Sequence, residues 1–222
     1  MNLQPTQIVF VEPVVWLGDC HPLVDQLGSA SGLAMLGSAA VTRRLGAITD
    51  RAGLRQFLRE YHQRLLVPVE LPAIHRAWQH AAKNQLRELL ALDRRLAEEP
   101  LLRPFAEPSR RAGQRQLRRF KTVHDVRLVQ RYLRALERGE AHAWHTLVYG
   151  VTMWLFSLPL RQGLLGYARQ VTRGFIHAAA GPLRLTEAQQ RELFEELAEP
   201  LAAEVGAQVA TTPGPDRSGP LG

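Results

Sequence analysis

Two histidines three residues apart are a pair whose residue type and spacing could support metal chemistry. His142 and His145 would share one face of a helix, where they could bind a metal ion if a third ligand came from elsewhere. The nearest carboxylate in the sequence is Glu140. Because metal sites need several convergent ligands, we interpret both residues as core or interface histidines. A metal-dependent enzyme that uses this pair remains an alternative.

The sequence lacks the other motifs by which enzymes are commonly identified. It contains no glycine-rich phosphate-binding loop, no G-x-G-x-x-G and no G-x-S-x-G. Cys20 and His21 could pair a nucleophile with a base, but no third group that would orient them can be identified. His75 and His80 are five residues apart, which would put them on different faces of a helix, so we expect surface residues. The residue patterns therefore predict neither an active site nor a bound cofactor.

The cysteine content and the first residues indicate the cellular compartment of the protein. Cys20 is the single cysteine and cannot form an internal disulfide, which fits a reducing compartment. Residues 1–10 lack the basic start of a signal peptide, and Glu12, Pro13 and Asp19 interrupt the apolar residues that follow. We therefore expect a cytoplasmic protein.

One uncharged segment would have to be covered by the other helices of the protein. Residues 141–160 carry no full charge in a sequence otherwise dense with arginine. Their length, about 20 residues, could cross a bilayer, but His142, His145, Thr146 and Pro159 dilute the hydrophobicity. We predict a central helix that is buried on nearly every side, with no membrane partner.

Amphipathic helices are predicted around this segment. Asp50 would cap a helix that carries one apolar stripe, and Pro68 would end this helix. Thr186 and Gln189 fit a capping box that opens the last helix, and Pro200 would break or kink that helix. The stripe consists of Leu54, Phe57, Leu58, Tyr61 and Leu65.

No segment alternates apolar and polar residues as a strand would. The predicted fold is all-α, a single-domain irregular or orthogonal bundle of about eight to ten helices, with residues 1–27 as an N-terminal arm, 28–205 as the helical domain and 206–222 as a disordered tail.

The net charge of +7 comes almost wholly from arginine. An excess of this kind can indicate a nucleic-acid or anionic-membrane partner. The arginines are spread over most predicted helices and interleaved with glutamate and glutamine, as on a solvated helical surface. We therefore favour a protein without a nucleic-acid partner and keep a basic nucleic-acid or membrane-surface binder as the alternative.

Short motifs along the chain resemble a known family. The central ones are H-T-L-V-Y-G at 145–150, S-L-P-L at 157–160 and Tyr167, followed by Ala178-Ala179 and by Pro182-Leu183 with Thr186 and Gln189. Upstream lie Ser109 with Gly113, Glu70-Leu71-Pro72 and G-S-A-S-G-L at 28–33. In their order and spacing, over roughly residues 25–200, these motifs resemble the urease accessory protein UreF family.

The resemblance implies an all-α assembly factor with no enzymatic activity, and residues 28–205 would be its UreF-like domain. Such proteins form a homodimer, bind the accessory protein UreD (also called UreH) and recruit the GTPase UreG. The assembly delivers nickel to apo-urease, so nickel would be in transit and no cofactor resident. A UreD-like partner is expected around residues 167–189. Ten matched positions are candidates for partner binding: Tyr167, Pro182, Leu183, Thr186, Gln189, Ser31, Gly32, Ser109, Gly113 and His145.

The chain departs from the family pattern at three of these motif positions. Ala34 stands where the family has glutamate, and Arg184 and Leu185 stand where it has glycine and glutamine. Contacts that the family makes with its GTPase partner, or along a nickel path, through these positions would differ in this protein.

Overall fold

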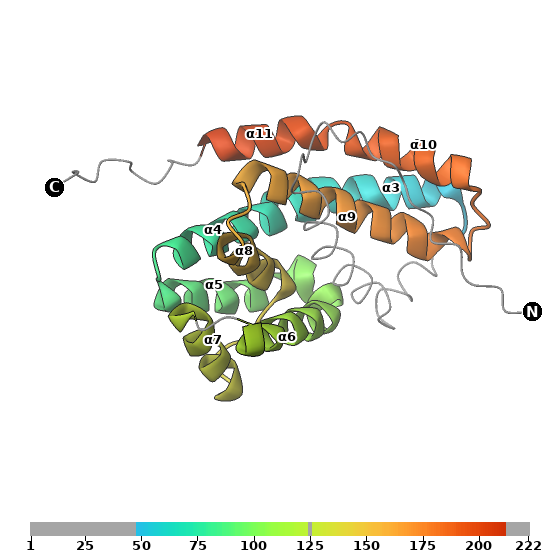
Figure 1. The fold of residues 1–222 in the computed structure, drawn as a ribbon. Coiled ribbons are helices and arrows are strands. Elements are labelled where there is room, and N and C mark those ends of the chain that lie inside the picture. Colours follow the sequence, from blue (N-terminus) through green and yellow to red (C-terminus); the bar gives the residue numbers. More distant parts are fainter. Residues whose placement is uncertain (1–47, 124–125, 212–222) are drawn as a thin grey trace, which may run out of the picture.

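The computed structural model describes residues 48–123 and 126–211. These residues form nine α-helices, one π-helix and one 3-10 helix, and no strand, which confirms the predicted all-α bundle of about eight to ten helices (Figure 1). The predicted arm over 1–27 and the part of the predicted tail beyond residue 211 lie outside the described residues. In the described part of the chain, no helix is long and apolar enough to cross a bilayer.

The first part of the bundle is one long helical run followed by shorter helices. Asp50 caps α3 (Arg51–Tyr61), and its carboxylate accepts from the backbone N–H of Gly53 at 2.7 Å, as predicted. The run continues through the π-helix η3 (His62–Glu70) into α4 (Leu71–Ala82). After it come α5 (Leu86–Glu98), the 3-10 helix η4 (Pro100–Phe105), α6 (Ala106–Val123) and α7 (Arg127–Glu137).

The helix end predicted at Pro68 is wrong. Pro68 lies inside η3, and the backbone of its neighbours stays helical. Proline has no N–H to donate and its ring crowds the preceding turn of an α-helix. In a π-helix, donors pair with carbonyls five residues back, which widens the turn. The wider turn accommodates the ring, so the helix passes the proline without ending.

The predicted central helix is shorter than expected. Helix α8 spans His145–Leu155, and every residue from His145 to Met153 is buried, which confirms a helix covered on nearly all sides. The segment before it is not helical, because Ala143 has a left-handed φ of 54° and the backbone N–H groups of residues 142 and 143 donate to the buried Asp93 carboxylate. The helix stops before Ser157, whose φ is 53°.

Glycines set how closely other helices approach α8. A Cβ atom on Gly150 would lie 2.5 Å from the carbonyl oxygen of Ile74 in α4. A Cβ atom on Gly113 of α6 would lie 2.1 Å from the carbonyl oxygen of Ala143. Only glycine fits at either position, so α4 and α6 pack directly on the backbone of α8 and of the segment before it.

The last helices cover the other side of the bundle. Helix α9 (Leu160–Ala180) packs against α3, α4, α10 (Glu187–Ala198) and α11 (Leu201–Thr211), as Figure 1 shows. The chain breaks between α10 and α11 at Pro200, as predicted. Residues 206–211, expected to begin the disordered tail, belong to α11, because Val205 is buried and Val209 packs against the core and extends the apolar face of the helix.

Candidate interaction surface

An exposed turn joins α9 to α10 and carries four of the candidate residues. Pro182 and Thr186 are exposed, and Leu183 and Gln189 are half-buried. The backbone N–H of Leu185 donates to the carbonyl of Ala180 at 2.9 Å, which satisfies an end carbonyl of α9. The turn is therefore held in one conformation by hydrogen bonds at its start.

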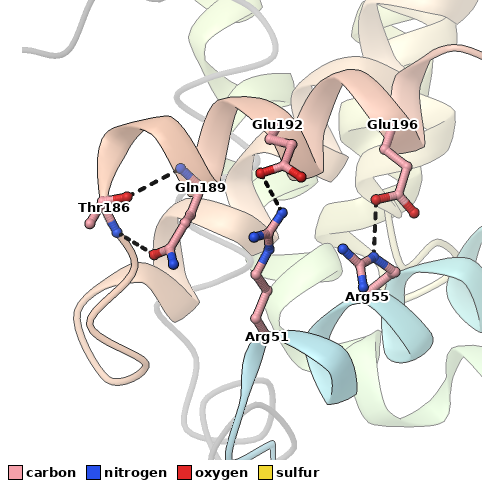
Figure 2. Close-up of polar contacts among 6 residues, drawn as sticks. All are labelled: Arg51, Arg55, Thr186, Gln189, Glu192 and Glu196. Atoms are coloured by element: carbon pink, nitrogen blue, oxygen red, sulfur yellow. Dashed lines mark hydrogen bonds and ion pairs between the residues drawn. The ribbon is translucent and has the colours of Figure 1, made fainter.

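The capping box predicted at the start of α10 is confirmed. The backbone N–H of Gln189 donates to Thr186 Oγ1 at 3.3 Å, and the backbone N–H of Thr186 donates to Gln189 Oε1 at 2.9 Å (Figure 2). The two side chains satisfy backbone donors that a helix start otherwise leaves unpaired. Arg184, which departs from the family pattern, is exposed in this turn with a φ of 52°, a conformation that favours the glycine of the family.

Ion pairs fix α10 against α3 beside this turn. Arg51 pairs with Glu192 at 2.7 Å, and Arg55 pairs with Glu196 at 3.0 Å (Figure 2). Arg59 reaches the other oxygen of Glu196 at 2.7 Å. Each exposed or half-exposed pair contributes about 0.2–1 kcal/mol, so the array sets the orientation of α10 more than its stability.

Four other candidate residues are buried and cannot touch a partner directly in this structure. Tyr167 has only 1% of its surface exposed; its ring stacks on His145 and lies 5.1 Å from the Tyr149 ring. Ser109 accepts from the backbone N–H of His145 at 3.2 Å and so satisfies a donor at the start of α8. Gly113 is the close-packing glycine of α6. These residues position α6, α8 and α9 around one another.

A buried carboxyl group lies close to this core and was not among the candidate residues. Glu70, at the end of η3, has 2% of its surface exposed and accepts from the Tyr61 hydroxyl. The hydroxyl of Tyr167 is near enough to lower its pKa, although the two groups do not reach normal hydrogen-bond geometry. Burial outweighs both hydroxyls and raises the pKa of Glu70 to about 7.

The geometry expected for a two-histidine metal site is wrong. His142 precedes α8 in the non-helical segment, so it does not share a helical face with His145. Burial lowers the pKa of His145 to about 4, and within residues 48–123 and 126–211 no group of three or more potential ligands converges. The expectation that His75 lies on the surface is also wrong, because α4 turns it inward and leaves it 5% exposed.

Comparison with protein families identifies the chain. The UreF family model matches residues 48–195, which is more than half of the 222 residues. The chain belongs to the UreF family of urease accessory proteins. No curated protein matches it. The match begins at residue 48, so Ser31, Gly32 and Ala34 lie outside both the matched segment and the described residues.

Membership of the UreF family implies an accessory role in urease maturation. The match includes the exposed turn, the capping box and the four buried candidates. The family motifs thus fall into two groups in this protein, one that shapes the core and one that lies at the surface.

Proposed function

We propose that this protein is a urease assembly scaffold that binds a UreD (UreH) partner and recruits the GTPase UreG, so that nickel reaches apo-urease. The family match over residues 48–195 carries this proposal. The protein would act as a cytoplasmic homodimer with no catalytic step of its own. Nickel would be cargo of the assembly and not a resident cofactor.

The turn before α10 is the proposed contact for the UreD-like partner. It combines family motif residues with exposure, since Pro182 and Thr186 face solvent. Its hydrogen bonds, the capping box and the α3–α10 ion pairs hold it in place before a partner arrives. A preformed surface binds with less loss of conformational entropy than a flexible one. Tyr167 is buried against the His145 and Tyr149 rings and takes no part in this contact.

Co-purification with a tagged UreD-like protein tests the proposal. The variant Pro182→Arg/Ala188→Arg places two bulky cations on exposed positions of the turn and of α10. The variant Ala82→Arg/Ala203→Arg adds the same groups at exposed positions of α4 and α11 and serves as the matched control. We expect the first variant to lose the partner and the second to retain it.

Two results would contradict the proposal at different levels. If folded wild-type protein shows no affinity for the UreD-like protein, the scaffold role itself fails. If both variants bind as well as the wild type, the scaffold role stands and the contact lies elsewhere on the molecule. Melting curves of both variants establish that they are folded.

A further inference from the structure

A hollow of about 670 Å³ runs along α6, which lies at the periphery of the bundle (Figure 1). We call it the arginine groove, because five of its eight lining residues are arginines: Arg103, Arg110, Arg111, Arg115 and Arg118. All except Arg110 are exposed. Helix α6 contributes four of these arginines and η4 contributes the fifth.

The charge in the groove is not balanced by acidic residues. Glu107 is the single acidic residue of the lining, and it pairs with Arg111 at 2.8 Å. Among the described residues, the other four arginines of the groove form no ion pair. The arginines of α3 differ, because each of Arg51, Arg55 and Arg59 has a glutamate of α10 as its partner.

The base of the groove holds one guanidinium group in a fixed position. Arg110 lies over the Trp144 ring, with its central carbon 4.8 Å from the ring centroid. Its Nε is buried and has no hydrogen-bond partner. Burial raises the pKa of Asp93, and the charge of Arg110 is the smallest of the effects that oppose this rise. A buried donor without a partner costs free energy.

The exposed arginines form a short row on one face of the helix. Arg111, Arg115 and Arg118 follow one another at steps of four and three residues, so they are neighbours on α6. Like charges at this spacing repel each other, and a ligand with negative charge relieves the repulsion. The row is roughly 10 Å long, which an extended peptide of about three or four residues spans.

We propose that the arginine groove binds a short acidic segment of a partner protein through its aspartate and glutamate side chains. Arginine forms two parallel hydrogen bonds with a carboxylate, and a chain of carboxylates at peptide spacing matches the row. A duplex nucleic acid fits less well, because affinity for it comes from several phosphate contacts along a path longer than this row. The inference rests on the proposed function in one respect, that the partner is a protein.

Fluorescence anisotropy with a labelled Asp/Glu-rich octapeptide and the full-length protein tests the proposal. The variant Arg111→Glu/Arg115→Glu/Arg118→Glu reverses three exposed charges in the groove. The variant Arg64→Glu/Arg76→Glu/Arg134→Glu makes the same change in net charge at exposed positions of η3, α4 and α7. We expect the groove variant to bind the peptide at least about tenfold more weakly, and the control variant to bind close to the wild-type level.

Several outcomes would overturn this proposal. The wild type could fail to bind the peptide, or both variants could lose binding equally, which would indicate attraction by net charge alone. A duplex DNA oligonucleotide of equal charge could bind more tightly than the peptide and depend on the same three arginines, which would assign the groove to nucleic acid. The peptide assay contains no urease protein, so its failure leaves the scaffold role untouched. Melting curves show whether each variant is folded.

Discussion

The surroundings of α8 and the contact between α3 and α10 are built from different interactions. Around α8, backbones meet directly at Gly113 and Gly150, and nine consecutive residues are buried. Between α3 and α10, long side chains meet as ion pairs at partly exposed positions. The first region tolerates no added atom, whereas the second can adjust. The buried family motifs therefore preserve the shape of the bundle, while the exposed ones are free to contact a partner.

Among these variants, Gly113→Ala should cause the largest loss of stability. The new methyl group would lie 2.1 Å from a backbone oxygen that cannot move without displacing the start of α8. We expect a loss of about 4 kcal/mol or more in the free energy of unfolding, or no folding at all. Urea denaturation followed by circular dichroism measures it. Gly181→Ala, at an open and helical position at the end of α9, is the control and should change stability little.

Tyr149→Ala should come next in size. The side chain is fully buried, and its hydroxyl donates to the carbonyl of Gly163 at 3.1 Å. We expect a loss of about 3–5 kcal/mol. Leu155→Ala, at the partly buried end of the same helix, should cost only roughly 1 kcal/mol. Equal losses in the two variants would show that burial does not decline along α8 as described.

Glu70→Gln should change how stability depends on pH. The pKa of Glu70 is about 7 when folded and close to the ordinary glutamate value of 4.5 when unfolded. Between these values the folded state keeps a proton that the unfolded state has released, so this group makes the protein less stable as pH rises. We expect the wild type to lose on the order of 3 kcal/mol relative to the glutamine variant from about pH 4.5 to about pH 8, most of it below pH 7.

Urea titrations of both proteins from pH 4.5 to 8 measure this difference. His62 and His145 act with the opposite sign, because burial lowers their pKa values to about 4 and their contribution to stability is lost as pH falls below the unfolded value of 6.5. That contribution is common to both proteins and cancels in the comparison. Parallel curves for the two proteins would mean that Glu70 is ionised in the folded state.

Thr186→Ala should have the smallest effect. It removes the hydroxyl that accepts from the Gln189 backbone N–H, and we expect a loss of about 1 kcal/mol. A helix-cap residue at the surface should not disturb the packing around α8. Thermal melting shows the change, and hydrogen exchange should show faster opening in the first turn of α10 only. A loss as large as that of Tyr149→Ala would erase the distinction between the two regions.

Local patterns were sufficient to predict much of the fold. The apolar stripe of α3, the cap at Asp50, the capping box of Thr186 and Gln189 and the break at Pro200 all depend on residues close in sequence. Periodicity and capping report such local preferences directly. The family resemblance was also readable from the order of short motifs, and the family match confirms it.

Properties that depend on distant residues could not be predicted. The burial of Glu70 requires Tyr61 and Tyr167 around it, and the inward turn of His75 depends on the phase of a helix that Pro68 was expected to end. The motif containing Tyr167 carried no sign of which way the side chain faces. The arginines of the groove are close in sequence, but the hollow that they line is visible only in the fold.

Because η3 carries the chain past Pro68, α3 and α4 form one uninterrupted rod that belongs to both sides of the molecule. Its first part packs on α9 and α10, and its second part packs on α8. Neither side can unfold while the other stays folded, because unfolding of either would remove part of the rod on which the other packs. Denaturation should accordingly proceed as a single transition, and fragments separated between α8 and α9 should be unable to fold alone.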